Sequence, residues 1–176
     1  MAHELEIVNG NAQMAYVGDV PWHGLGTKVP ADLTPEQFMV KAGLDWTVEK
    51  EDILTRSGIK VKNKQALVRS SDGSILDVVG TGWNPVQNSE AFNFFEEYVN
   101  AGDMEMHTAG SLKDGQMVWA LAKTKDGFEL FNGDQTDNYF LFTNPHQFGK
   151  AINIRMTRIR VVCNNCLLYT SPSPRD

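Results

Sequence analysis

The first regular pattern along the chain is helical and covers residues 34–42. Thr34 stands at the N-cap position, Pro35 is at the first helical position, and Gln37 completes a capping box. Gly43 follows directly and supplies the left-handed residue at which helices commonly end. These signals predict a helix over residues 34–42.

A second set of apolar residues recurs with helical spacing over residues 89–100. Asn88 or Ser89 is placed to cap this helix, and Glu90 lies in the first turn, where a negative charge is favourable. Gly102 is placed to end it. The sequence therefore predicts one helix over about 89–100.

The rest of the pattern is typical of strands, because apolar and polar residues alternate or form short apolar runs. The expected strands are 46–50, 58–64 with 66–68, 75–79, 104–112, 117–123, 128–131, 139–143 and 151–163. Turn residues at 71–74 and 113–115 join two pairs of these strands as hairpins. Strands and helices are segregated along the chain, which predicts an α+β fold with a mainly antiparallel sheet in a single domain.

Three segments differ in character. Residues 1–32 are rich in glycine without a sustained period, so we expect an extended, loop-rich N-terminal arm. Residues 33–165 form the α+β domain. Residues 166–176, CLLYTSPSPRD, match the translation of a transposon-based sequencing adapter at every position. We interpret them as a non-native tail and expect the domain to be truncated at its C-terminus.

Composition narrows the class of protein. Hydrophobic residues make up 41% of the chain and charged residues 22%, which is enough for a packed core. The formal net charge of −6 excludes an overall basic composition but leaves room for a local basic surface. No apolar run approaches the ~18–20 residues of a membrane span, and no signal peptide is recognisable. With two cysteines, a reducing cytoplasm is the expected location, without a membrane partner.

Basic residues gather in two stretches that contain no acid, one between Asp52 and Asp72 and one after Asp137. Alternating bases project from one face of a strand and form a stripe that contacts phosphates. The candidate nucleic-acid-binding residues are Lys60, Lys62, Lys64, Arg155, Arg158 and Arg160. Candidate aromatic partners for stacking on bases are Trp46, Trp83, Tyr139, Phe140 and Phe142. The alternative is a solvated edge strand whose charges prevent pairing with other sheets.

The pattern over 151–163 changes phase midway. In a regular strand, the apolar side chains before Thr157 would lie on the same face as Arg158 and Arg160. Such a strand would therefore bury two arginines or expose apolar residues. We therefore expect a bulge or bend near Thr157, a feature that often re-aims side chains at functional sites.

Other candidate chemistry is weaker. The histidines and Cys163 lack the spacing of metal motifs, so neither a metal nor a cofactor is predicted. Ser111 is not in a nucleophile elbow, because Lys113 stands where the second glycine is needed. Cys163 follows two valines and is expected to be a buried thiol. The stretch 22–24, Trp-His-Gly, is interpreted either as a packed turn or as part of a site.

Several motifs together resemble one family. Residues 15–26, 85–92, 109–112, 118–119 and 160–165 are similar to phage- and plasmid-like proteins that carry domain of unknown function 932. The resemblance covers residues 1–165 and implies a setting on phages or plasmids, often near recombination genes, but no reaction. The family-motif residues to which it gives no role are Trp22, His23, Gly24, Gln87, Asn88, Cys163, Asn164 and Asn165.

Three functions remain open. The favoured hypothesis is a mobile-element protein that binds nucleic acid, above all single-stranded DNA, with protein partners from a recombination or replication system. The second is an enzyme of unknown reaction, which the sequence favours less. Its pocket would contain His23, Gln87, Asn88, His146, Arg160, Cys163 and Asn164. The third is a protein-binding or anti-defence module that uses the acidic surface. Polar motif residues around one cleft would favour the enzyme, and a basic stripe with exposed aromatics would favour the binder.

Overall fold

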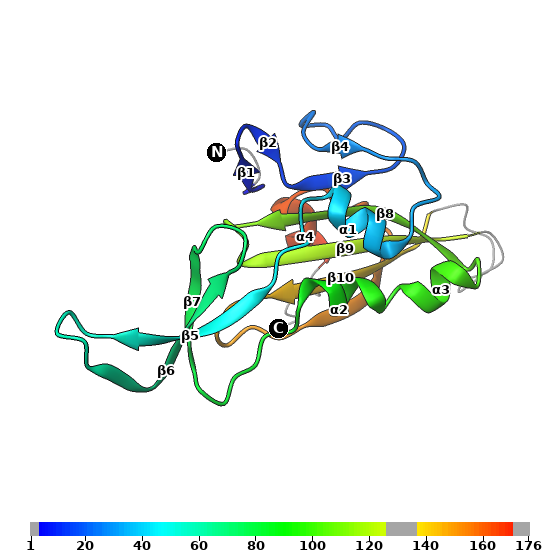
Figure 1. Cartoon of the computed structure of the whole chain (residues 1–176). Helices are drawn as coiled ribbons and strands as arrows, with labels where there is room; N and C mark the ends of the chain where they lie inside the picture. The colour runs from blue at the N-terminus through cyan, green and yellow to red at the C-terminus, as the bar shows by residue number, and fades with distance from the viewer. Residues whose placement is uncertain (1–3, 126–136, 171–176) are drawn as a thin grey trace, which may run out of the picture.

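A six-stranded sheet forms the centre of the molecule in the computed structural model, which describes residues 4–125 and 137–170 (Figure 1). Its strand order is β11-β10-β9-β8-β3-β4. These strands are β3 (Met14–Tyr16), β4 (Thr27–Lys28), β8 (Met104–Leu112), β9 (Met117–Thr124), β10 (Tyr139–Pro145) and β11 (Asn153–Thr157). Neighbours are antiparallel except for β3 and β4, which are parallel. The predicted α+β class with a mainly antiparallel sheet is confirmed.

Three further strands form a separate antiparallel sheet in the order β5-β6-β7. They are β5 (Val48–Leu54), β6 (Lys60–Arg69) and β7 (Ile75–Gly80). The turn predicted at 71–74 joins β6 to β7, and the turn predicted at 113–115 joins β8 to β9. The hairpin end of β5 and β6 projects from the left side of the molecule in Figure 1. This end carries the predicted basic strand.

The N-terminal segment is built into the fold. Two short strands, β1 (Ile7–Val8) and β2 (Asn11–Ala12), pair with each other. β3 lies between β8 and β4 in the central sheet, and all three of its residues are buried. The segment predicted as a loop-rich arm over 1–32 therefore contributes both loops and a buried strand.

Helix α1 (Pro35–Lys41) confirms the helix predicted over 34–42. The Thr34 side chain accepts a hydrogen bond from the Gln37 amide, and the Gln37 side chain accepts one from the Thr34 amide. Gly43 has a φ of +76°, and the amides that follow the helix bond back to its last turn in a Schellman motif. Local sequence was sufficient to predict this helix, because the N-terminal cap and the glycine that ends the helix lie within ten residues of each other.

The second predicted helix is divided into α2 (Asn88–Asn93) and α3 (Glu96–Asn100), so the prediction of one helix over 89–100 is wrong. The Phe95 amide bonds to the carbonyl of Phe92, three residues back, which tightens the chain between the two helices. Both phenyl rings are buried against the central sheet. Packing of these rings thus overrides the continuous helical pattern.

The cap of α2 also differs from the prediction. Gln87 is the N-cap residue, in place of Asn88 or Ser89, and its amide donates to the Glu90 carboxylate at 2.7 Å. Asn88 lies inside the helix with its side chain buried. Its amide bonds to distant residues, which is why it does not serve as the cap.

The strand predicted over 151–163 is too long, since β11 ends at Thr157. The chain bends at residues 158–159, which confirms the irregularity expected near Thr157. Beyond the bend Val161 and Val162 are buried, so these apolar side chains reach the core without continuing the strand. The strand predicted over 128–131 lies outside the described residues.

Helix α4 (Asn164–Thr170) follows the bend. Leu167 is buried on the central sheet, so the first part of the segment predicted as a non-native tail packs on the fold. Residues 171–176 lie outside the described part. The origin of residues 166–176 stays a prediction that resequencing of the locus tests. None of the described helices is both long and apolar enough to cross a membrane.

The central sheet is covered on both faces. On β9, Val118, Ala120 and Ala122 belong to the core shared with α1, α2 and all three strands of the small sheet. Trp119 and Leu121 alternate with them and belong to the second core, beneath the N-terminal segment and α4. β9 begins with a continuous apolar run, as strands buried on both faces commonly do, whereas the buried strand β8 also contains polar residues.

Candidate functional site

The polar residues for which the sequence suggested one shared pocket fall into two groups. Gln87, Asn88 and His146 lie beside the core that contains α1 and α2. His23, Arg160, Cys163 and Asn164 lie on the opposite face of the sheet, around the chain that enters α4. The described residues therefore do not bring the seven predicted residues to one pocket.

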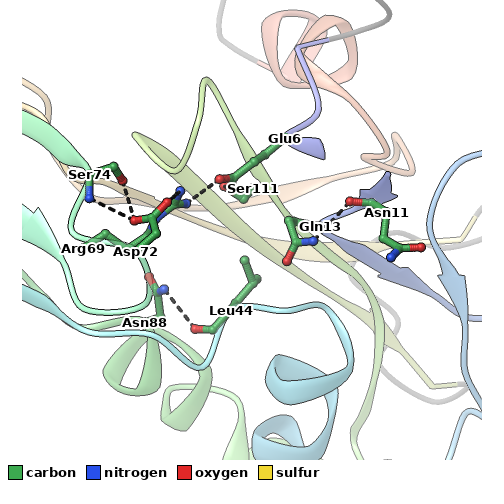
Figure 2. Close-up of polar contacts among 9 residues, drawn as sticks. All are labelled: Glu6, Asn11, Gln13, Leu44, Arg69, Asp72, Ser74, Asn88 and Ser111. Carbon is green, nitrogen blue, oxygen red and sulfur yellow. Dashed lines mark hydrogen bonds and ion pairs between the residues drawn. The ribbon is translucent and has the colours of Figure 1, made fainter. Parts of the chain in front are cut away.

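The first group is a buried polar cluster. Asn88 donates from Nδ2 to the Leu44 carbonyl at 3.0 Å (Figure 2), and its Oδ1 accepts from His146 Nε2 at 2.9 Å. An amide oxygen can only accept, so His146 is protonated on Nε2. His146 is fully buried, and burial lowers its pKa to about 4. It is thus a neutral, structural histidine at neutral pH.

Gln87 joins the start of α2 to the small sheet. Its Oε1 accepts from the Val48 amide and its Nε2 donates to the Val48 carbonyl, both at 2.9 Å. The side chain pairs with β5 as a neighbouring strand would. Gln87 thereby fixes the loop before α2 against β5.

A half-open hollow of about 160 Å³ lies next to this cluster. The loop between β7 and α2, the end of β10 and the chain after it form its walls. Its lining residues are Trp83, Asn84, Val86, Asn144, Pro145, Lys150 and Ile152. Asn144 is 1% exposed and donates from Nδ2 to the Val86 carbonyl at 2.8 Å. Its buried Oδ1 accepts no hydrogen bond from any described residue.

The predicted basic strand contacts this region through Lys64. Lys64 Nζ lies 5.8 Å from the centre of the Phe148 ring, and Phe148 is 64% exposed. The Phe148 amide donates to Asp77 Oδ2 at 2.6 Å, which holds the loop after β10 on β7. Lys150 lies two residues further on and lines the hollow. We call Lys62, Lys64, Trp83, Phe148 and Lys150 the lysine–aromatic surface.

The three predicted lysines are all exposed on β6. Lys60 pairs with Asp52 at 2.9 Å, and this hydrogen bond lowers the pKa of Asp52. Regular alternation is interrupted between Lys62 and Lys64, because Asn63 has a φ of +61°. The lysines therefore follow one strand without all projecting from one regular face.

The predicted arginines lie elsewhere. Arg160 donates from Nη2 to the carbonyls of Val17 and Asp19, both at 2.8 Å, and so holds the N-terminal segment. Arg155 on β11 is half-buried and donates to the Leu167 carbonyl at 3.4 Å. Arg158 follows the end of β11, so the prediction that Arg158 and Arg160 share one face of a strand is wrong.

Most of the predicted stacking aromatics are in the core. Trp46, Tyr139 and Phe142 are buried and cannot stack on a ligand. Phe140 packs against the core that contains Trp46 and Phe142. Trp83 is half-buried at the hollow. Sequence reasoning missed Phe148, although an aromatic residue within the turn-rich stretch 145–150 is a signal for exposure.

The second group of motif residues holds two loops together. The Gly24 amide bonds to the Pro21 carbonyl at 2.8 Å, which closes a turn around Trp22 and His23. His23 accepts from the Leu25 amide at Nδ1 and donates from Nε2 to the Val162 carbonyl at 3.0 Å. Burial raises the pKa of Cys163. The packed-turn interpretation of this motif fits these contacts.

Cys163 Sγ lies 3.6 Å from Cys166 Sγ, and Asn164 and Asn165 open α4 between them. Within residues 4–125 and 137–170 no three histidine, cysteine or acidic side chains gather as a metal site.

Figure 2 shows an ionic network around Arg69 that the sequence analysis did not predict. Arg69 pairs with the Glu6 carboxylate, which also accepts from Ser111 Oγ at 2.7 Å. Arg69 binds Asp72 through Nε at 3.1 Å and Nη2 at 2.7 Å, and the Asp72 pKa is held below its usual range by these bonds. The network joins the N-terminal segment, the small sheet and β8. Its members lie far apart in sequence, so no local signal reveals it.

A sequence model described as domain of unknown function (DUF932) matches residues 75–171. No curated protein matches the chain, and no solved structure does. The matched range contains every residue that lines the hollow, whereas β5 and β6 precede it.

Proposed function

This chain belongs to the DUF932 family, and from that premise we propose that it binds single-stranded nucleic acid through the lysine–aromatic surface. The phage or plasmid setting that its sequence resemblance implies would place this binding in recombination or replication. Proteins of such a system, in the cytoplasm, would be its partners.

The contact between Lys64 and Phe148 is the observation that carries the proposal. It brings a lysine of the projecting β6 strand beside an exposed aromatic ring in the loop after β10. Proteins that bind single strands combine cations along the backbone with aromatic rings on which bases stack. Both kinds of side chain are available together here.

The charges around the surface support an anionic ligand. Lys62, Lys64 and Lys150 are exposed, although the chain as a whole is acidic. Lys50 adds a positive charge beside the hollow, where its Nζ donates to the Thr81 carbonyl at 2.6 Å. The nearby Asp77 carboxylate accepts from the backbone amides of Val78 and Phe148. A phosphate backbone would therefore meet more positive than negative charge at this surface.

Fluorescence anisotropy with a labelled single strand of about 20 nucleotides and mixed sequence tests the proposal across a salt series. Three lysine contacts imply that log Kobs falls with log salt at a slope of about −2. Replacing Lys62, Lys64 and Lys150 with Gln should weaken binding and bring the slope close to zero.

The matched control replaces three exposed lysines outside the surface, Lys28, Lys41 and Lys113, with Gln. The two triple variants carry the same net charge, so a general electrostatic effect would weaken both equally. The proposal is supported if the surface variant loses affinity while the control variant binds as tightly as the wild type. Absence of binding at low salt, or equal losses in both variants, would refute it.

A further inference from the structure

We propose that the projecting hairpin of β5 and β6 is a wedge that acts at the junction between double- and single-stranded nucleic acid. This inference rests on the proposed function and names its substrate class more closely. In this arrangement the single strand lies on the lysine–aromatic surface, and the hairpin tip lies against the first base pair of the duplex. The inference depends on the shape of the hairpin, the side chains at its tip and the charge along it.

The outer part of the hairpin is a two-stranded arm, which we define as residues 53–63. Pairing between β6 and β7 begins at Lys64, which lies opposite Gly80. On the tip side of this pair, in the described part of the chain, β6 is paired with β5 alone. Figure 1 shows the arm extending away from the central sheet. A narrow arm of this kind can enter the gap between two separating strands.

The tip of the arm is held in shape by its own hydrogen bonds. The Thr55 amide donates to the Ile59 carbonyl and the Gly58 amide donates to the Thr55 carbonyl, both at 2.8 Å. Thr55 Oγ1 accepts from the Ile59 amide at 3.1 Å and lies 3.0 Å from Ser57 Oγ. The tip therefore needs little ordering when it meets a ligand, and less free energy is lost on binding.

Two large aliphatic side chains are exposed at this tip. Leu54 is 60% exposed and Ile59 is 67% exposed. Leu54 lies opposite Lys60, so these two share one face of the arm, while Ile59, the neighbour of Lys60, lies on the other face. Each face of the tip thus carries one aliphatic side chain. Leucine and isoleucine are among the residues that proteins insert between base pairs to unstack them.

The charge of the arm favours nucleic acid as the partner of these aliphatic side chains. Arg56 and Lys62 are exposed, and no acidic residue lies between Asp52 and Lys64 in the sequence. Lys62 also belongs to the lysine–aromatic surface, so positive charge continues from the tip to the contact between Lys64 and Phe148. A strand held on that surface leads directly to the tip.

The test compares three labelled DNAs by fluorescence anisotropy: a single strand, a blunt duplex, and a duplex that carries the same single strand as a tail. The wild-type protein should bind the tailed duplex about tenfold more tightly than the single strand, which corresponds to burial of roughly one aliphatic side chain. The blunt duplex should bind more weakly than the single strand, because it offers no strand to the lysine–aromatic surface.

Substitutions at the tip make the result specific. Leu54→Ser with Ile59→Ser should remove the preference for the tailed duplex and leave affinity for the single strand and its salt slope unchanged. Leu54→Met with Ile59→Leu should retain the preference, because both side chains stay large and apolar. The matched control is Val20→Ser with Ile75→Ser, which removes two aliphatic side chains that are 58% and 67% exposed outside the arm. Thermal melting shows whether each variant is folded.

A second measurement detects opening of the duplex itself. With 2-aminopurine in the first base pair of the tailed duplex, unstacking increases the fluorescence of this base. The wild-type protein and the control variant should produce the increase, and the Leu54→Ser, Ile59→Ser variant should not.

The outcomes separate this inference from the function on which it rests. Equal affinity for the tailed duplex and the single strand, with a lysine-dependent salt slope, would overturn the wedge and leave the proposed function standing. The wedge would also be overturned by a preference that survives the two serine substitutions in a folded variant, or by a preference without increased 2-aminopurine fluorescence. Tip-dependent binding to phosphatidylserine vesicles without a preference for the tailed duplex would assign the tip to a membrane surface instead. Failure to bind any of the three DNAs would refute both the wedge and the proposed function.

Discussion

Arg69 is a buried cation held from three directions. Glu6 and Asp72 bind its guanidinium, and the group lies 5.2 Å from the Trp46 ring. Hydrogen bonding to Asp72 is the main cause that raises the pKa of Arg69 above its ordinary value. One side chain thus connects the N-terminal segment with both sheets.

Removal of this cation is the first prediction. Arg69→Met leaves the Glu6 carboxylate buried without its partner, and we expect the free energy of unfolding to fall by about 3–5 kcal/mol. The double variant Glu6→Gln with Arg69→Met should recover part of the loss, because no charge remains buried there. Urea denaturation measures both.

The control is the exposed pair of Lys60 and Asp52, for which Lys60→Met should produce no measurable change in stability. Equal losses from Arg69→Met and Lys60→Met would contradict the importance of the buried network.

His107 and His146, the buried histidines of the described residues, give the second prediction. Burial lowers the pKa of His146 to about 4, and burial together with Arg160 does the same for His107. In the unfolded chain both titrate near 6.5. The unfolded state therefore binds more protons below that pH, and stability should fall as the pH decreases from about 6.5 to about 4.

For His146 alone the loss amounts to roughly 3 kcal/mol when the titration is complete. His146→Gln can still donate to Asn88 but cannot titrate, so its stability should depend less on pH. Urea denaturation at several pH values checks this expectation. A wild-type profile that is flat over this range, or one that His146→Gln leaves unchanged, would argue against a neutral buried imidazole.

At the scale of elements, the best-predicted features are those encoded locally. The capping box and Gly43 define α1 completely, and turn residues define two hairpins. The division between α2 and α3 could not be predicted, because it depends on how Phe92 and Phe95 pack on a sheet formed later in the chain. The early end of β11 likewise depends on Arg160, which bonds to carbonyls more than a hundred residues away.

The third prediction concerns the close packing of Gly110 on β8 against Trp119 on β9. A Cβ added at Gly110 would collide with the Trp119 ring and lie 2.9 Å from the Gln13 carbonyl oxygen. The ring cannot move easily, because it is buried and its Nε1 donates to Thr108. Gly110→Ala should lower the free energy of unfolding by about 1–3 kcal/mol, as overpacking does.

Gly80→Ala is the matched change in another strand, where the nearest atom to an added Cβ lies 4.0 Å away. It should be close to neutral. Similar melting temperatures for the two variants would show that the strand packing is looser than described.

At the scale of the whole molecule, the candidate surface is assembled from β6, the loop before α2 and the loop after β10. The sequence correctly singled out the lysines of β6 as exposed. It missed Phe148, Asn144 and the hollow, because these become neighbours only when β10 is placed beside the loop before α2. It also grouped Arg160 with the lysines, since a strand pattern does not reveal that a guanidinium is engaged by backbone carbonyls.

Arg160 supplies the fourth prediction, which separates structural from binding cations. Arg160→Gln removes bonds to Val17 and Asp19, so hydrogen exchange should become faster in residues 17–25. Affinity for a single strand and its salt slope should stay unchanged, because Arg160 is not on the lysine–aromatic surface. A reduced slope in this variant would place Arg160 in the interface after all.

The most direct test of the proposed interface is an NMR titration of the isotope-labelled protein with oligo-dC. We predict that amide shifts change at three places that are distant in sequence, Lys62–Lys64, Trp83–Val86 and Phe148–Lys150, and that His23 and its surroundings stay unaffected. These three places are neighbours only in the folded protein. Saturable shifts confined to other surfaces, or no shifts at low salt, would contradict the lysine–aromatic surface as the nucleic-acid interface.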